Sequence, residues 1–110
     1  MIEIVEYADA AGNSPFRLWF DGLDREAAAI VTVSVNRLGT GNTSNAKAVG
    51  GGVTELKINR GPGYRVYFGW DGATLVILLG GGTKKRQEDD IEAARHRWQE
   101  YKRRKRAGRE

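Results

Sequence analysis

Apolar and polar residues alternate with two different periods at the start of the chain. In residues 1–7, Ile2 and Ile4 alternate with Glu3, and this period of two predicts a short strand. A helix is predicted next, because Ser14 can cap it and Pro15 at its first position loses no hydrogen bond. Its apolar side chains recur at i, i+3, i+4 and i+7 and form one stripe: Phe16, Trp19, Phe20 and Leu23.

Residues 24–38 carry signals for both a strand and a helix. Their β-branched part, residues 30–35, has strand propensity. Helical spacing also fits, with Asp24 as the N-cap. The residues that would share one face are Ala27, Ile30, Val31, Ser34, Val35 and Leu38. The helical periodicity covers the whole segment and the strand propensity only part of it, so we predict a helix.

The middle of the chain predicts a loop followed by three strands. Residues 39–52 are rich in Gly, Asn, Ser and Thr, which is typical of a loop. The strand candidates are residues 53–59, 64–70 and 74–80. Turn residues separate them: Pro62 between the first two, and Asp71-Gly72, a tight-hairpin dipeptide, between the last two. We therefore expect an antiparallel meander.

The chain from Gln87 onward predicts an amphipathic helix. Ile91, Ala94, Trp98 and Tyr101 recur at helical spacing among charged residues. The expected order is thus β-α-α-β-β-β-α, an α+β fold in which helices pack on an antiparallel sheet. We expect a single domain over residues 1–110, with a basic, disordered tail from about residue 103.

The alternation of the strands predicts one apolar and one polar sheet face. Leu56 and Ile58 point to the apolar face, and Lys57, Arg65 and Tyr67 to the polar one. Arg60 lies in the adjoining turn. The last strand is apolar on both faces and runs into three glycines followed by three cations: Lys84, Lys85 and Arg86. We expect these cations to meet the polar face, with the glycines allowing a ligand to approach the backbone.

Charge is distributed unevenly along the chain, in agreement with a basic surface at its C-terminal end. Residues 1–83 hold seven Lys or Arg against eight Asp or Glu, hence −1, and residues 84–110 hold eleven against six, hence +5. This favours a polyanionic partner such as a nucleic acid, although a basic tail can also serve solubility alone. An aromatic side chain within a basic surface is typical of sites for unstacked bases and phosphates.

Several other chemistries are excluded or poorly supported. The chain has no cysteine, and its one histidine, His96, lacks a second His or Cys for a metal site, so we expect neither metal nor cofactor. The acidic run of residues 88–90 is explained by a helix N-terminus. No secretory signal or membrane span is visible, and we expect a cytoplasmic protein without a membrane partner.

Two stretches resemble a known family: GVTELKINRGPGYRVYFG at residues 52–69 and LVILLGGGTKKRQEDDIEAARHRWQEYK at residues 75–102. They resemble the RelE/ParE superfamily of type II toxins, in particular its HigB-like branch, the phage-derived, Gp49-like addiction module killer proteins. The resemblance extends over nearly the whole chain. It implies a RelE-like fold and a cognate antitoxin encoded beside the toxin, of helix-turn-helix type in a HigB-like pair.

The resemblance also implies an activity and candidate residues. RelE-like and HigB-like members cleave mRNA, usually on the ribosome and without metal, whereas ParE-like members inhibit DNA gyrase. Carried over by motif, the catalytic candidates are Arg65, Lys84 and Lys57. The RNA-binding candidates are Arg60, Tyr67, Lys85 and Arg86. The sequence departs from this branch at Thr83, where an acid is usual, and at residues 85 and 86, where small hydroxyl residues are usual.

An endoribonuclease of this kind would use the RNA 2′-hydroxyl as nucleophile. Its attack on the adjacent phosphate leaves a 2′,3′-cyclic phosphate and a free 5′-hydroxyl, and cations stabilise the charge that develops. Which lysine acts as base is left open. Two alternatives also remain open: a gyrase-inhibiting toxin that acts by protein binding, and an RNA-binding module without catalysis.

Overall fold

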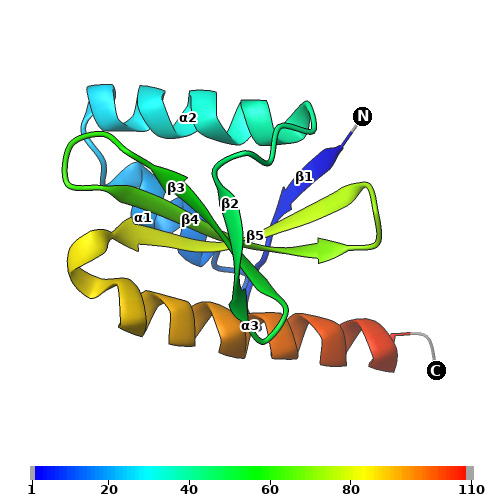
Figure 1. The fold of residues 1–110 in the computed structure, drawn as a ribbon. Helices are drawn as coiled ribbons and strands as arrows, with labels where there is room; N and C mark the ends of the chain where they lie inside the picture. Colours follow the sequence, from blue (N-terminus) through cyan, green and yellow to red (C-terminus); the bar gives the residue numbers. More distant parts are fainter. Residues whose placement is uncertain (1, 109–110) are drawn as a thin grey trace.

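The computed structural model describes residues 2–108, which form three helices around one five-stranded sheet (Figure 1). The helices are α1 (Pro15–Asp21), α2 (Arg25–Gly39) and α3 (Gln87–Ala107), with a short 3-10 turn, η1 (Lys84–Arg86), ahead of α3. The strands are β1 (Glu3–Glu6), β2 (Ala46–Gly50), β3 (Val53–Ile58), β4 (Tyr64–Asp71) and β5 (Leu75–Thr83). The predicted α+β class is confirmed.

The helix predictions are confirmed together with their caps. The Ser14 hydroxyl accepts a hydrogen bond from the amide of Arg17, and the Asp24 carboxylate accepts one from the amide of Ala27. Arg25–Gly39 is helical despite its β-branched stretch, because the helix places Val31 and Leu38, both fully buried, on the sheet-facing side. Tertiary burial outweighs local propensity here.

The sheet differs from expectation in two respects. Its strand order is β1-β5-β4-β3-β2, and β1 pairs with β5 in parallel, so the sheet is mixed rather than wholly antiparallel. Ala46–Gly50, expected to be part of a loop, forms β2, which pairs with β3. The meander from β3 to β5 is antiparallel as predicted, and Gly72 has a positive φ in its last hairpin.

Helices cover both faces of the sheet, which gives three layers (Figure 1). On one face, α1 and α2 pack on an apolar cluster that includes Phe16, Val66 and Phe68. On the other, α3 packs its Ala94 and Trp98 against Tyr67 and its buried neighbours. The expectation of one open polar face is therefore wrong. An apolar stripe on the last helix and a strand that is apolar on both sides both require this second layer.

The basic segment that we expected as a tail continues α3. Residues 103–107 are helical, and Lys105 forms an ion pair with Asp71 of β4 at 2.5 Å. Residues 109 and 110 lie outside the described part. Among residues 2–108, no helix is long and apolar enough to cross a membrane.

Candidate active site

Two rows of side chains run across the sheet under α3. In the first row, Lys57 of β3 is paired with Arg65 of β4, which is paired with Gly82 of β5. In the second row, Glu55 is paired with Tyr67, and Tyr67 with Gly80. Directly paired residues in a sheet point to the same face, so all of these positions face α3. Lys57 is exposed at the end of its row.

Arg65 is buried, with only 4% of its surface exposed. Its Nη1 donates a hydrogen bond of 2.8 Å to the carbonyl oxygen of Gly63, and its Nε lies 3.6 Å from Oε1 of Glu55. Glu55 is fully buried, and its Oε2 accepts a hydrogen bond of 2.8 Å from Nε2 of Gln87 at the start of α3. Glu55 therefore joins β3, β4 and α3 at this point.

The same cluster contains three buried polar atoms that find no hydrogen-bond partner within the described residues: Glu55 Oε1, Arg65 Nε and Tyr67 OH. At 3.6 Å the two charged atoms attract one another, but the separation is too long for a hydrogen bond. Unsatisfied buried groups are rare and commonly mark functional or strained sites. Their concentration here distinguishes this part of the sheet from the apolar core around it.

Tyr67 does not lie on an open surface as we expected for an RNA-binding residue. It is fully buried and packs with Trp98 and Leu79. Burial raises the pKa of its hydroxyl far above the usual value, and the charge of Glu55 raises this pKa further. The phenol therefore stays protonated and can donate a hydrogen bond. Stacking on a base is incompatible with this position.

The cationic segment after β5 lies beside Arg65. Lys84, Lys85 and Arg86 are exposed and form η1. Gly63 links this turn to the buried arginine, because a Cβ atom at Gly63 would lie 3.2 Å from Nη1 of Arg65 and 3.5 Å from Cβ of Lys84. The structure thus brings Lys84 next to Arg65, with Lys57 on the far side of Arg65 along the strand register.

The three glycines before Lys84 have a different role from the one we expected. They belong to β5, and helix side chains occupy the space above each of them. A Cβ atom would lie 2.2 Å from the Trp19 ring at Gly81, 2.7 Å from Arg97 at Gly80 and 2.0 Å from Asp90 at Gly82. The glycines therefore allow helices, rather than a ligand, to approach the strand closely.

Asp90 and Arg97 of α3 are the charged groups over these glycines. Burial raises the pKa of the Asp90 carboxyl, and burial lowers the pKa of the Arg97 guanidinium. Arg97 also donates a hydrogen bond of 3.0 Å to the carbonyl oxygen of Leu79. Arg97 thereby fastens α3 to β5, Asp90 packs over Gly82, and the N-terminal end of α3 lies above the Glu55 cluster. Within residues 2–108, no group of three or more His, Cys, Asp or Glu residues is arranged to hold a metal ion.

Arg60 lies apart from the buried cluster, in the turn between β3 and β4. It lines a groove between α2 and β3, where Lys57 also contributes. The seven candidate residues predicted from the sequence therefore lie at different places in the structure. Lys57, Arg65 and Lys84 belong to one place, Lys85 and Arg86 follow in η1, Arg60 lies in the groove, and Tyr67 is part of the core.

Sequence reasoning missed Glu55. Its alternation with Leu56 placed it on the same face as Lys57, so the signal was present. A carboxylate is not a group that attracts RNA, but a buried arginine requires a neighbouring negative charge, and Glu55 provides it.

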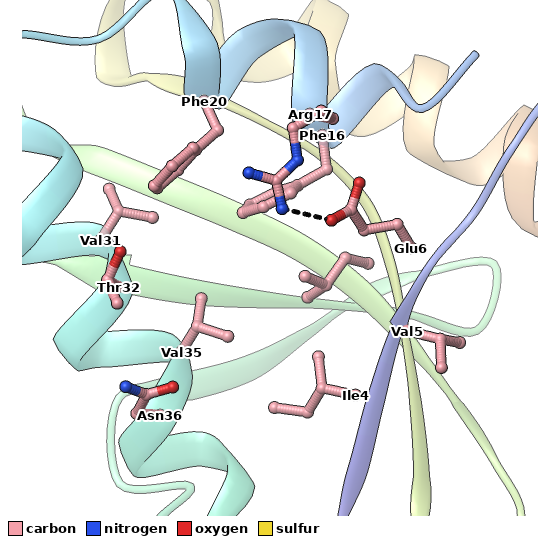
Figure 2. Close-up of a pocket in the computed structure, with 11 residues that line it drawn as sticks. Ile4, Val5, Glu6, Phe16, Arg17, Phe20, Val31, Thr32, Val35 and Asn36 are labelled. Atoms are coloured by element: carbon pink, nitrogen blue, oxygen red, sulfur yellow. Dashed lines mark hydrogen bonds and ion pairs between the residues drawn. The ribbon is translucent and has the colours of Figure 1, made fainter.

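A separate hollow of about 560 Å³ lies between α1, α2 and β1 (Figure 2). Phe16, Phe20 and Val35 line it with other apolar side chains. At its rim, Arg17 forms an ion pair of 2.5 Å with Glu6. The hydrogen bond from Arg17 lowers the pKa of the Glu6 carboxyl. This hollow has no catalytic grouping, and its paired rim charges favour neither an anion nor a cation.

Comparison with known proteins identifies the family. The family model described as phage derived protein Gp49-like (DUF891) matches residues 18–99, which include α2, the whole meander and most of α3. The chain belongs to the phage-derived Gp49-like family. This family consists of addiction module killer, RelE-like toxins, so the resemblance noted in the sequence is confirmed. Membership of a toxin–antitoxin family implies a cognate antitoxin as partner.

The Gp49-like chain is also similar to an uncharacterized protein of Haemophilus influenzae. The two are 41% identical over 81 residues, which cover 73% of this chain and 82% of the relative. The family match includes Lys57, Arg65 and Lys84 only as members of a matching region, so the roles of these residues depend on the geometry given above.

Proposed function

We propose that this protein is the toxin of a type II toxin–antitoxin module and acts in the cytoplasm as a metal-independent mRNA endoribonuclease on the ribosome. The observation that carries the proposal is the grouping of three cations at one end of the sheet. Lys57 is paired with Arg65, and the backbone of Gly63 connects Arg65 to Lys84. Three cations around one point suit a phosphate that gains negative charge during reaction.

The reaction is transesterification within the RNA. The 2′-hydroxyl loses its proton and attacks the adjacent phosphorus, the bond to the 5′-oxygen breaks, and that oxygen takes up a proton. The products are a 2′,3′-cyclic phosphate and a 5′-hydroxyl. The protein must orient the phosphate, stabilise its charge and exchange two protons.

The residues suit different parts of this task. Lys57 and Lys84 are exposed, so they can reach the phosphate and exchange protons with it. The guanidinium of Arg65 is fixed by Glu55 and Gly63 with Nη1 directed toward Gly63, the side on which Lys84 lies. A pre-oriented guanidinium provides positive charge without reorganisation when the phosphate charge develops. Glu55 acts as a positioning residue through Arg65.

Growth arrest with mapping of mRNA 5′ ends tests the proposal. The full chain is expressed from an inducible promoter, and wild type is compared with Lys84→Ala, Lys57→Ala and the control Arg103→Ala. We expect new 5′-hydroxyl ends in translated mRNA with wild type and Arg103→Ala, and strongly reduced ends with the two other variants.

A supercoiling assay with DNA gyrase separates the alternative. Growth arrest without new mRNA ends, together with inhibition of gyrase, would reject the nuclease and favour a ParE-like toxin. RNA binding without either effect would instead identify a non-catalytic module. The adjoining open reading frame is expected to encode a helix-turn-helix antitoxin, and its co-expression should restore growth.

A further inference from the structure

The groove between α2 and β3 differs in charge from the hollow between α1, α2 and β1 and from the hollow near the end of α3, and a smaller hollow that adjoins it shares Arg37 and Lys57. The groove has a volume of about 380 Å³, within the range of small-ligand sites, and the cations Arg37 and Arg60 line it. Lys57 also lines it, although its side chain belongs to the row that faces α3. None of the described residues that line the groove carries a carboxylate. In the hollow between α1, α2 and β1, by contrast, the one cation is matched by Glu6. The hollow near the end of α3 balances Arg104 and Lys105 with Glu6 and Asp71.

The three cations of the groove are available for a ligand. Arg37, Lys57 and Arg60 are exposed, and none of their side chains takes part in a hydrogen bond or ion pair within residues 2–108. Arg60 also lines a neighbouring hollow that contains Asp24 and Glu26, whereas Arg37 and Lys57 do not. The excess positive charge therefore lies along the α2–β3 groove and attracts an anion.

Apolar and hydrogen-bonding groups lie between these cations. Ile30 and Val33 of α2 provide an apolar wall, and Val33 is 47% exposed. Asn45 and Asn59 place amide groups in the same groove. An amide presents both a donor and an acceptor, as the edge of an RNA base does. Phosphate-binding cations, an apolar surface and amides together suit a nucleotide of single-stranded RNA.

Lys57 makes the groove continuous with the candidate active site. Its backbone is paired with Arg65, and its amide donates a hydrogen bond to the carbonyl oxygen of Asn45 inside the groove wall. We propose that the α2–β3 groove binds the RNA next to the cleaved bond, with phosphates on Arg37 and Arg60 and a base against Ile30 and Val33. This proposal rests on the proposed endoribonuclease function and adds a second substrate-binding element to it.

Salt-dependent RNA binding tests the groove apart from catalysis. The ligand is a fluorescein-labelled single-stranded RNA that is 2′-O-methylated, so that it cannot be cleaved. Arg37→Ala is compared with Arg25→Ala, which removes an exposed cation of α2 outside the groove. Loss of one phosphate contact should weaken binding. It should also reduce the magnitude of the slope of log association constant against log salt concentration by about 0.7. We expect this change for Arg37→Ala and the wild-type slope for Arg25→Ala.

A second pair of variants tests the apolar wall. Val33→Glu should weaken binding of the same RNA much more than Val5→Glu, which alters an exposed apolar residue of β1. If Arg37→Ala and Arg25→Ala give equal slopes while the wild-type protein cleaves mRNA, the groove proposal is wrong and the proposed nuclease function stands. A wild type that neither binds RNA nor produces mRNA ends overturns the proposed function and the groove with it. If Arg37→Ala weakens only the complex with the antitoxin, the groove binds protein and the proposal is wrong.

Discussion

Nε of Arg65 lies 3.6 Å from Oε1 of Glu55, and both side chains are almost completely buried between the sheet and α3. Each charge has the other as its nearest compensation, because the interior solvates neither well. This ion pair explains how a strand inside a three-layer fold carries an arginine. It also means that substitutions at Arg65 change stability as well as activity.

Arg65→Ala should destabilise the protein by about 3–5 kcal/mol, because it leaves the Glu55 carboxylate buried without a counter-charge. Urea unfolding followed by circular dichroism measures this change. Arg103→Ala is the control, since the exposed Arg103 lies 3.8 Å from the half-buried Glu100 and loss of this pair should cost about 0–1 kcal/mol. Equal effects of the two substitutions would show that the buried pair contributes no more than a surface pair.

Gly81→Ala should destabilise the fold by about 1–3 kcal/mol, because its methyl group would overlap the Trp19 ring of α1. Gly22→Ala is the matched control. Gly22 has a φ of −83° and its added Cβ would make ordinary contacts, so this change should be neutral or stabilise by about 0.4–1 kcal/mol. Thermal unfolding of both variants gives the comparison, and a Gly81→Ala protein as stable as wild type contradicts the close packing of α1 on β5.

Lys84→Ala and Lys85→Ala should affect RNA cleavage differently. Lys84 lies beside Gly63 and Arg65, so its loss should slow cleavage of bound RNA about 10²–10³-fold, as removal of one group that stabilises developing charge does elsewhere. Lys85 is the next residue of η1, and its loss should mainly weaken the binding of RNA and make that binding less dependent on salt concentration. Single-turnover cleavage at saturating protein separates the two effects. Similar bound-state rates for both variants would reject the role of Lys84.

Asp90→Asn should change stability in a pH-dependent way. Burial raises the pKa of Asp90, so the folded state holds this proton more tightly than the unfolded state. The resulting stability is fully present below the unfolded pKa and is lost as pH rises through the folded pKa. Asp90→Asn removes that loss. The unfolding free energy of the variant, relative to that of wild type, should therefore be higher at about pH 7 than at about pH 3, two values on either side of the ordinary pKa of Asp.

Urea unfolding at these two pH values measures the effect. Glu88→Gln changes an exposed acid in the same first turn of α3 and is the control. If both variants follow the same pH dependence, the effect comes from the helix terminus in general and not from the burial of Asp90.

Sequence pattern predicted the helices well because each carries a continuous apolar stripe, and α1 and α2 also begin at a capping side chain. It missed β2 because Ala46–Gly50 has no β-branched alternation beyond Val49, and its glycines indicate a turn. Gly50, Gly51 and Gly52 indeed have positive φ and form the turn into β3. The strand before them is imposed by pairing with β3, which local propensity does not record.

The candidate site was predicted in part. Alternation correctly assigned Lys57 and Arg65 to one face, since direct pairing of β3 and β4 follows from their hairpin. It did not reveal that α3 covers that face, which depends on long-range packing of Trp98 against Gly52 and Gly69. Burial of Tyr67 and the role of Glu55 follow from this cover, so neither was visible in the strand pattern alone.

The parallel pairing of β1 with β5 has a consequence for the order of folding. Glu3 is paired with Leu75, and the described sheet offers β1 no other neighbour, whereas β2 to β5 form a meander of local hairpins. Contacts between distant parts of a chain close late, because more chain entropy must be lost first. We expect the meander to form the nucleus and β1 to dock last. In native-state hydrogen exchange, the amides of β1 should then open at lower free energy than those of β4.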